Sequence, residues 1–463
     1  MDKNRRGGSR QAELFPRSMS PTIAIAENHR LVVMTNEVDW TELEELIQSI
    51  RMSVLSSAAG RPPRLRALAG ALALRATRRM TYRETEDLIR YYAPARYLCG
   101  LTETTWTPDA NTIQDFEQLM GEDGMRRINE YVVKWAVEEG LADPTVVVAD
   151  TTAQEAAIPH PNEVGHLASF LTAVMAASSR AGKTLKELAE KMVSQVKVAR
   201  QKVRAHRLFA KTVGAKKKLT RELAAIVARV NSELGRSLQK AGAQRERLAR
   251  YGKVAWDKLN SLHGVMDTLL PQIRYWLRTG RVATGKIINV HIPELYSIVR
   301  GKAGKAVEFG LKWGFARLRG GFILATVAKG RKDLADQRFV LQAVEQHIAL
   351  FGKAPKSYAY DRGGWSADNV KKLKAKGVKE VGLAPRGKAK WAVGTKVKEK
   401  LVNERAQVEG SIGTVKGARY GFNRPPARSA AMMGVCGQRA VLGLNLNKVI
   451  RGIATRREVE LVG

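Results

Sequence analysis

Apolar residues recur at helical spacing in the first third of the chain, and polar residues fill the positions between them. Three segments put their apolar side chains on one side of a helix, namely residues 43–55, 64–78 and 82–92. Asp109 or Asn111 is placed to cap the start of a further helix, residues 108–120. We therefore expect an all-α domain at 39–140, preceded by a basic flexible tail at 1–38.

The pattern then changes to short β-branched runs that alternate with helices. Residues 145–150 (TVVVAD) form such a run and end in an acid, which is typical of a buried central strand. Further strands are expected at 286–292, 306–318, 321–330, 356–361 and 378–385. Helices are expected at 334–352, 367–377, 403–420 and 430–451, the first of them ending at Gly352. This alternation predicts an α/β core made of 141–164 and 286–463.

A long basic helical stretch, 165–285, interrupts this core after its first strand. Between residues 181 and 280 there are 23 Lys or Arg but only 7 Asp or Glu. Its helical runs predict a pair of long antiparallel helices. Two tryptophans, Trp256 and Trp276, either pack between these helices or stack on an unpaired base.

The chain of 463 residues is long enough for two or three domains, and its 44% hydrophobic content is enough to build their cores. Its formal charge of +35 indicates a polyanionic partner, most commonly nucleic acid. The basic stretch would bind DNA backbone with strong salt dependence, or else form a solvated Lys-rich coiled coil. We expect no membrane span and no signal peptide. Two cysteines, Cys99 and Cys436, exclude a cysteine zinc site and fit a reducing cytoplasm.

Two aspartates are the first candidates for chemistry. Asp150 and Asp361 each end a predicted strand, and functional groups gather beyond strand ends in an open α/β sheet. Adjacent carboxylates repel unless a cation lies between them, and Mg²⁺ is the cation that suits phosphate substrates. Each aspartate alone is also explained by a turn or a helix cap. Thr152 either orders Asp150 through its hydroxyl or only ends the strand.

A third acid lies in NERAQVEGSIGTVKG. Arg405, Glu409 and Lys416 share one face of the expected helix. That face is either functional or a solvated stripe of ion pairs. Three glycines weaken the helix by roughly 1 kcal/mol each and would allow close contact with the sheet or with DNA: Gly410, Gly413 and Gly417.

Taken together, Asp-x-Thr at Asp150, Tyr-Asp-x-Gly at Asp361 and Arg-x3-Glu-x6-Lys at Glu409 resemble the DDE transposases of bacterial insertion sequences. Residues 60–101 and 108–113 resemble the helical N-terminal domain of the same enzymes. The extended motif differs at Val402, where many relatives have Tyr. The resemblance covers most of the chain apart from the tail and the basic stretch. It implies an RNase H-like catalytic domain in which a late helix joins two strands.

The resemblance also implies roles for these residues. Asp150, Asp361 and Glu409 would be the catalytic acids and would ligate two Mg²⁺ ions, or Mn²⁺ in their place. Arg405 and Lys416 would bind DNA phosphates, as would Arg362 beside Asp361. The reaction would be DNA cleavage at the element's terminal inverted repeats and strand transfer into target DNA. Such a protein would act on the nucleoid in the cytoplasm, as a dimer or larger assembly. Two alternatives remain, an inactive transposase-derived DNA-binding protein and another RNase H-like nuclease.

Overall fold

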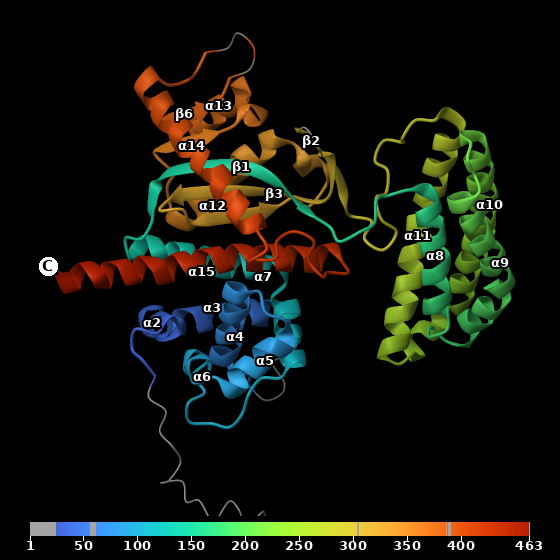
Figure 1. Cartoon of the computed structure of the whole chain (residues 1–463), viewed down its shortest axis with the longest axis horizontal. Helices are drawn as coiled ribbons and strands as arrows, with labels where there is room; N and C mark the ends of the chain where they lie inside the picture. Colours follow the sequence, from blue (N-terminus) through green and yellow to red (C-terminus); the bar gives the residue numbers. More distant parts are fainter. Residues whose placement is uncertain (1–24, 56–61, 303–304, 386, 388–389, 463) are drawn as a thin grey trace, which may run out of the picture. The chain divides into compact units, whose positions relative to one another are not determined.

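The computed structural model describes residues 25–55, 62–302, 305–385, 387 and 390–462 (Figure 1). The chain forms two compact units. The first contains residues up to Pro144 together with Leu318–Ile323 and residues from Arg439 onward, and the second contains Thr145–Arg317 and Leu324–Gln438. The expected catalytic range, 286–463, is therefore divided between the two units.

The first unit is built mainly from helices. They are α2 (Arg30–Glu37), α3 (Trp40–Val54), α4 (Leu65–Arg78), α5 (Tyr82–Tyr91), α6 (Ala93–Leu98) and α7 (Ala110–Glu138). Asp109 caps α7, since its Oδ1 accepts a 2.7 Å hydrogen bond from the Thr112 amide. The prediction of a flexible tail at 1–38 is wrong for residues 30–37, which form α2. Burial of Leu31–Met34 fixes this helix against the core of the unit. Residues 1–24 of that tail lie outside the described residues.

A buried ionic network joins α7 to Arg439, in the part of α15 (Ala430–Val462) that belongs to this unit. The Glu117 side chain is fully buried in α7. It pairs with Arg75 at 3.2 Å and with Arg439 of α15 at 2.9 Å. The Tyr82 hydroxyl donates a 3.0 Å hydrogen bond to the same carboxylate. Two cations and a hydroxyl thus compensate for removing this charge from water.

The central sheet is mixed. Its strands are β1 (Asp143–Glu155), β2 (Tyr296–Lys302), β3 (Lys305–Arg319), β4 (Ile323–Val327), β5 (Ser357–Tyr360) and β6 (Glu380–Leu383). Their order is β2-β3-β1-β5-β6, and β4 also pairs with β3. β1, β5 and β6 run parallel, whereas β2 and β3 are antiparallel. An α/β fold is therefore confirmed.

Three helices of the second unit follow the later strands, α12 (Asp336–Phe351), α13 (Ala367–Ala375) and α14 (Thr395–Lys416). Gly352 ends α12 in the left-handed conformation, at φ 72°, as its position predicts. α14 packs across the sheet on β5 and β6, where Leu401 and Val408 bury Val148 and Ala359 (Figure 1). This contact fixes which sheet face lies under α14.

The basic stretch forms four helices that share one core, not the expected pair. They are α8 (Glu163–Ser178), α9 (Lys183–Leu208), α10 (Val213–Ala241) and α11 (Arg250–Thr279), seen side by side in Figure 1. We call them the basic bundle. Short breaks between the helices, at 209–212 and 242–249, reverse the chain, and the helical periodicity on either side of each break does not reveal this.

The strand expected at 286–292 is absent, because this segment runs as an irregular connection. Ile287 and Val290 bury their side chains in the core of the basic bundle. The Ile287 amide donates to the Gln272 side chain at 3.0 Å rather than to a neighbouring strand. The apolar alternation that suggested a strand therefore reflects packing against α11.

Candidate active site and nucleic-acid surface

Asp150 and Asp361 lie side by side on neighbouring parallel strands. Val148 of β1 is paired in register with Ala359 of β5, and each aspartate follows its paired residue by two positions. Because side chains alternate between sheet faces, both aspartates point to the face that carries Val148 and Ala359. That face is the one that α14 covers. The two carboxylates therefore meet under α14.

Asp150 does not end its strand as expected. β1 continues to Glu155, and the Ala156 amide donates to the Phe309 carbonyl of β3 at 2.9 Å. Gly310 of β3 approaches so closely that a Cβ there would lie 1.8 Å from the Gln154 carbonyl oxygen. β1 thus keeps its partner β3 after the register with β5 has ended. Asp150 lies at the point where the sheet opens on the β5 side.

Asp150 feels both its burial and the charge of Asp361. Burial and then the charge of Asp361 raise the pKa of Asp150 to about 6, against the lowering effects of the Thr151 amide and Arg405. The Thr151 amide donates to Asp150 at 2.7 Å, and the Gly363 amide donates to Asp361 at 2.8 Å. Oxygen ligands that repel each other in a poorly solvated site fit a hard divalent cation.

A further acid beside the pair, Asp336, was not predicted. Its Oδ1 accepts hydrogen bonds from the Thr151 hydroxyl at 2.8 Å and from Lys312 Nζ at 2.7 Å. It also contributes to the raised pKa of Asp150. Asp336 opens α12, and its sequence context predicts only a favourable charge in the first turn of a helix. Only the fold brings it to Thr151.

The three residues of the α14 motif lie in different surroundings, since Glu409 faces solvent and Lys416 faces the sheet. The Glu409 side chain is 63% exposed and pairs with Arg405 at 3.7 Å. Arg405 is close enough to lower the pKa of Asp150, and with Glu409 it lines a pocket of about 350 Å³ at the carboxyl ends of β5 and β6. Lys416 lies 3.7 Å from Glu308 of β3, and both side chains are largely buried. Arg405 is thus the member of the motif that faces both Asp150 and Glu409.

The described residues contain no group of three or more acids, histidines or cysteines arranged to hold a metal ion. The register of β1 and β5 brings Asp150 and Asp361 together, whereas Glu409 is 63% exposed and pairs with Arg405. A Cβ at Gly410 or Gly413 would meet no atom within 4 Å, so these glycines do not serve contact with the sheet. Thr152 is buried, and the hydrogen bond to Asp150 comes from the Thr151 amide.

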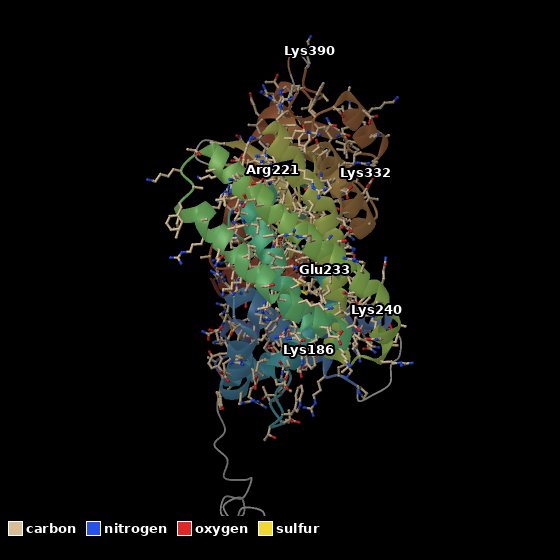
Figure 2. All side chains as sticks on the ribbon, turned by 90° about the vertical axis from the view of Figure 1, so that its right-hand side faces the viewer. Lys186, Arg221, Glu233, Lys240, Lys332 and Lys390 are labelled. Carbon is tan, nitrogen blue, oxygen red and sulfur yellow. The ribbon has the colours of Figure 1, made fainter. Side chains whose placement is uncertain are left out.

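The basic bundle presents a line of cations along α10. Five exposed side chains recur at helical spacing on one side of this helix, which we call the α10 stripe: Lys218, Arg221, Arg229, Arg236 and Lys240. Figure 2 labels Arg221 and Lys240 toward opposite ends of it. The stripe spans 22 residue steps, or about 33 Å of helix. Among the described residues none of the five belongs to a salt bridge, so their charge faces solvent.

Both tryptophans of the basic bundle pack against its core. Trp256 lies under Arg245, with the guanidinium carbon 5.4 Å from the ring centroid, and Trp276 lies 5.8 Å from Lys217 Nζ. Of the two interpretations, packing between helices describes their observed positions. Arg362, the remaining predicted DNA contact, is exposed directly after Asp361.

Comparison with known proteins gives one family match. Residues 21–119 match the family model described as "Transposase domain (DUF772)". No curated protein and no solved structure matches the chain. The match supports a transposase family, a transposition-related function and DNA as the partner. Of the helices in the described part of the chain, none has the length and apolar content needed to cross a membrane.

Proposed function

We propose that this chain is a DDE-type transposase that cleaves DNA at element ends and joins them to target DNA. One observation carries the proposal, namely the placement of Asp150 and Asp361 on neighbouring parallel strands with their carboxylates facing α14. The strand order supports an RNase H-like core, since β1 lies between antiparallel β3 and parallel β5. The family match at residues 21–119 supports the same class of enzyme.

In this proposal Asp150 and Asp361 would hold the divalent cations, two Mg²⁺ or Mn²⁺ ions, and Glu409 would complete the set of ligands. Bound cations supply Lewis-acid polarisation of the scissile phosphate. The chain itself supplies the closely spaced carboxylates, the Gly363 amide that orients Asp361, and Arg405 as a phosphate ligand. If a DNA phosphate bound Arg405, it would break the 3.7 Å ion pair between Arg405 and Glu409 and so free the Glu409 carboxylate. DNA binding and completion of the acid trio would then be coupled.

The basic bundle is the proposed backbone-binding surface. DNA carries one negative charge per about 1.7 Å of helix axis, so the α10 stripe faces many phosphates when it lies along a duplex. Within the described chain no side chain of the stripe forms a salt bridge that DNA would have to displace. Joining two element ends requires at least two copies of the chain in the DNA complex, which would act on the nucleoid in the cytoplasm.

Cleavage of DNA that carries the element's terminal inverted repeats, with and without Mg²⁺, tests the proposal. Asp361→Ala is expected to abolish cleavage and to leave DNA affinity nearly unchanged. Asp368→Ala is the matched control, because Asp368 is an exposed acid on α13 whose carboxylate pairs with Lys372 at 2.7 Å. If Asp361→Ala cleaved as fast as the parent, the assignment of the metal site would be wrong.

A second candidate is a DNA-binding protein of transposase descent that does not cut. The exposure of the Glu409 side chain, 63%, and its ion pair with Arg405 favour it. The cleavage assay distinguishes the two functions, because only a transposase would cut the DNA when Mg²⁺ is added. Binding without cleavage by the parent protein, on DNA with the correct ends, would establish the second function.

A further inference from the structure

The turn between α9 and α10 exposes a group of large apolar side chains. Leu208 is 63% exposed, Phe209 68% and Val213 72%. Elsewhere the two helices bury most of their large apolar side chains, with Met192 and Val227 fully covered in the core of the bundle. Val193 and Val198 of α9 are also exposed, at 56% and 43%, but less so than the three side chains at the turn. Leaving three such side chains in water is unfavourable, and adjacent exposed apolar residues commonly mark a binding surface. We call residues 208–213 the apolar tip.

The apolar tip lies inside an unbroken run of positive charge. Six Lys or Arg and no Asp or Glu occur between residues 204 and 218: Arg204, Arg207, Lys211, Lys216, Lys217 and Lys218. Within the described chain none of the six forms a salt bridge. The pKa of His206, beside the apolar tip, is lowered by burial and then by the charges of Lys216 and Arg207. The surroundings of the apolar tip are therefore strongly positive.

Helix stability does not explain all of these cations. Arg207 lies in the last turn of α9, where a positive charge is favourable. Lys216 and Lys217 instead lie near the start of α10, which Thr212 caps through a 3.1 Å hydrogen bond from the Ala215 amide. Cations at that end of a helix are unfavourable. Lys217 has a partner in the Trp276 ring, 5.8 Å away, so exposed Lys216 is the cation that indicates an anionic partner at the apolar tip.

We propose that the apolar tip is a wedge that enters a groove of duplex DNA and unstacks a base step. Phe209 and Leu208 would insert at the step, while the surrounding Lys and Arg bind phosphates on both sides of it. Proteins that kink DNA combine apolar wedges with flanking cations in this way. This inference rests on the proposed function only in taking DNA as the partner. It assigns to the basic bundle the distortion of DNA in addition to backbone binding.

Binding and distortion of a duplex by the full-length protein, measured in EDTA, test the wedge. The duplex carries 2-aminopurine, whose fluorescence rises on unstacking, and a donor–acceptor pair that reports bending. The parent protein should raise the fluorescence and bend the DNA. The double variant Leu208→Ser/Phe209→Ser should lose both signals and bind about 10-fold more weakly, as loss of base stacking does.

A matched control is available at the start of α11. Tyr251 and Val254 are 84% and 62% exposed on the same bundle, so Tyr251→Ser/Val254→Ser removes a similar apolar surface far along the chain from the apolar tip. This variant should unstack and bend DNA like the parent. Lys216→Gln/Lys218→Gln should weaken binding and its salt dependence while keeping the fluorescence change at saturation.

Several outcomes would overturn the wedge. Equal behaviour of the two serine variants would do so, as would a parent protein that binds without unstacking the DNA. Dimers that dissociate in the Leu208→Ser/Phe209→Ser variant, without any change in DNA distortion, would make the apolar tip an interface between copies. The test is independent of cleavage, since Asp361→Ala should still distort DNA. A protein that distorts DNA but never cleaves it would overturn the proposed function and keep the wedge.

Discussion

Asp150 is stabilised in its protonated form by its surroundings. Burial and Asp361 raise its pKa from 3.8 to about 6. The native state thus holds a proton between about pH 4 and pH 6 that the unfolded chain releases. Stability contributed by this group is full below pH 4 and is lost as the pH rises through 6. At neutral pH the ionised aspartate pair destabilises the fold, and a bound cation would remove that cost.

Replacing Asp150 with Asn should therefore stabilise the protein at neutral pH in the absence of divalent cations. The expected gain in unfolding free energy is on the order of 2 to 3 kcal/mol at pH 7.5 and near zero at pH 4. Urea denaturation of both proteins at the two pH values measures it, with Asp368→Asn as an exposed control. An equal gain at both pH values would show that burial of the ionised Asp150 carboxylate beside Asp361 is not its source.

Thr151 is expected to position Asp150 through Asp336. Its hydroxyl donates to Asp336 while its amide donates to Asp150, so one residue joins the two acids. Thr151→Val should lower the cleavage rate about 10-fold at unchanged DNA affinity, because it removes the hydroxyl that donates to Asp336 beside the proposed metal ligands. Thr151→Ser, which keeps the hydroxyl, should restore the rate. If Thr151→Ser cleaved as slowly as Thr151→Val, the Thr151 side chain would act by packing and not through its hydroxyl.

Among the helices and strands, those with strong local patterns could be predicted from the sequence. α12 with its stop at Gly352 and β5 lie where periodicity and turn residues put them, whereas α14 begins at Thr395, before the expected start at 403, and ends at Lys416, before the expected end at 420. The failures have a common cause, since they depend on partners distant in the chain. Residues 151–155 have no apolar run, yet β3 keeps them in β1. Residues 286–292 look like a strand, yet α11 supplies their packing.

The candidate site was predictable to the same extent. The Tyr-Asp-x-Gly and Asp-x-Thr motifs pointed to Asp361 and Asp150, and the sheet register brings these two together. Asp336 has no motif of its own, because only the tertiary contact with Thr151 and Lys312 distinguishes it from a helix-starting acid. The sequence did not reveal that Glu409 is exposed. Spacing shows which residues share a helix face, but it does not show what that face packs against.

The buried carboxylate of Glu117 is one of the contacts that join α15 to α7, beside the hydrogen bond from Asn445 to Asn129. Glu117→Gln would remove the charge that pairs with Arg75 at 3.2 Å and with Arg439 at 2.9 Å. Removing one member of a buried ionic network typically costs about 3 to 5 kcal/mol. Thermal unfolding should therefore show a large fall in stability, whereas Glu45→Gln on the exposed side of α3 should change it little. A small effect of Glu117→Gln would mean that the two arginines are solvated or paired elsewhere.

At the scale of the whole molecule, the charge of +35 is the property that the sequence and the fold express together. Folding concentrates part of it on the exposed sides of the basic bundle, away from acidic partners. A surface of this kind attracts DNA from a distance and releases counterions on contact. The affinity for DNA should therefore fall steeply as the salt concentration rises. The slope of this fall should depend on which cationic side chains are removed as well as on their number.

Neutralising the α10 stripe to Gln distinguishes a directed surface from general charge. Removing one cation that binds a phosphate should reduce the slope of log affinity against log salt by about 0.9, so removing all five predicts a reduction of about 4 to 5. The control removes the same charge from five exposed lysines outside the bundle: Lys353, Lys356, Lys371, Lys374 and Lys379. Filter binding at several salt concentrations measures both variants. A similar reduction in the control would mean that DNA responds to net charge alone. A reduction confined to the stripe variant would place the duplex along α10, beside the proposed wedge at its N-terminal end.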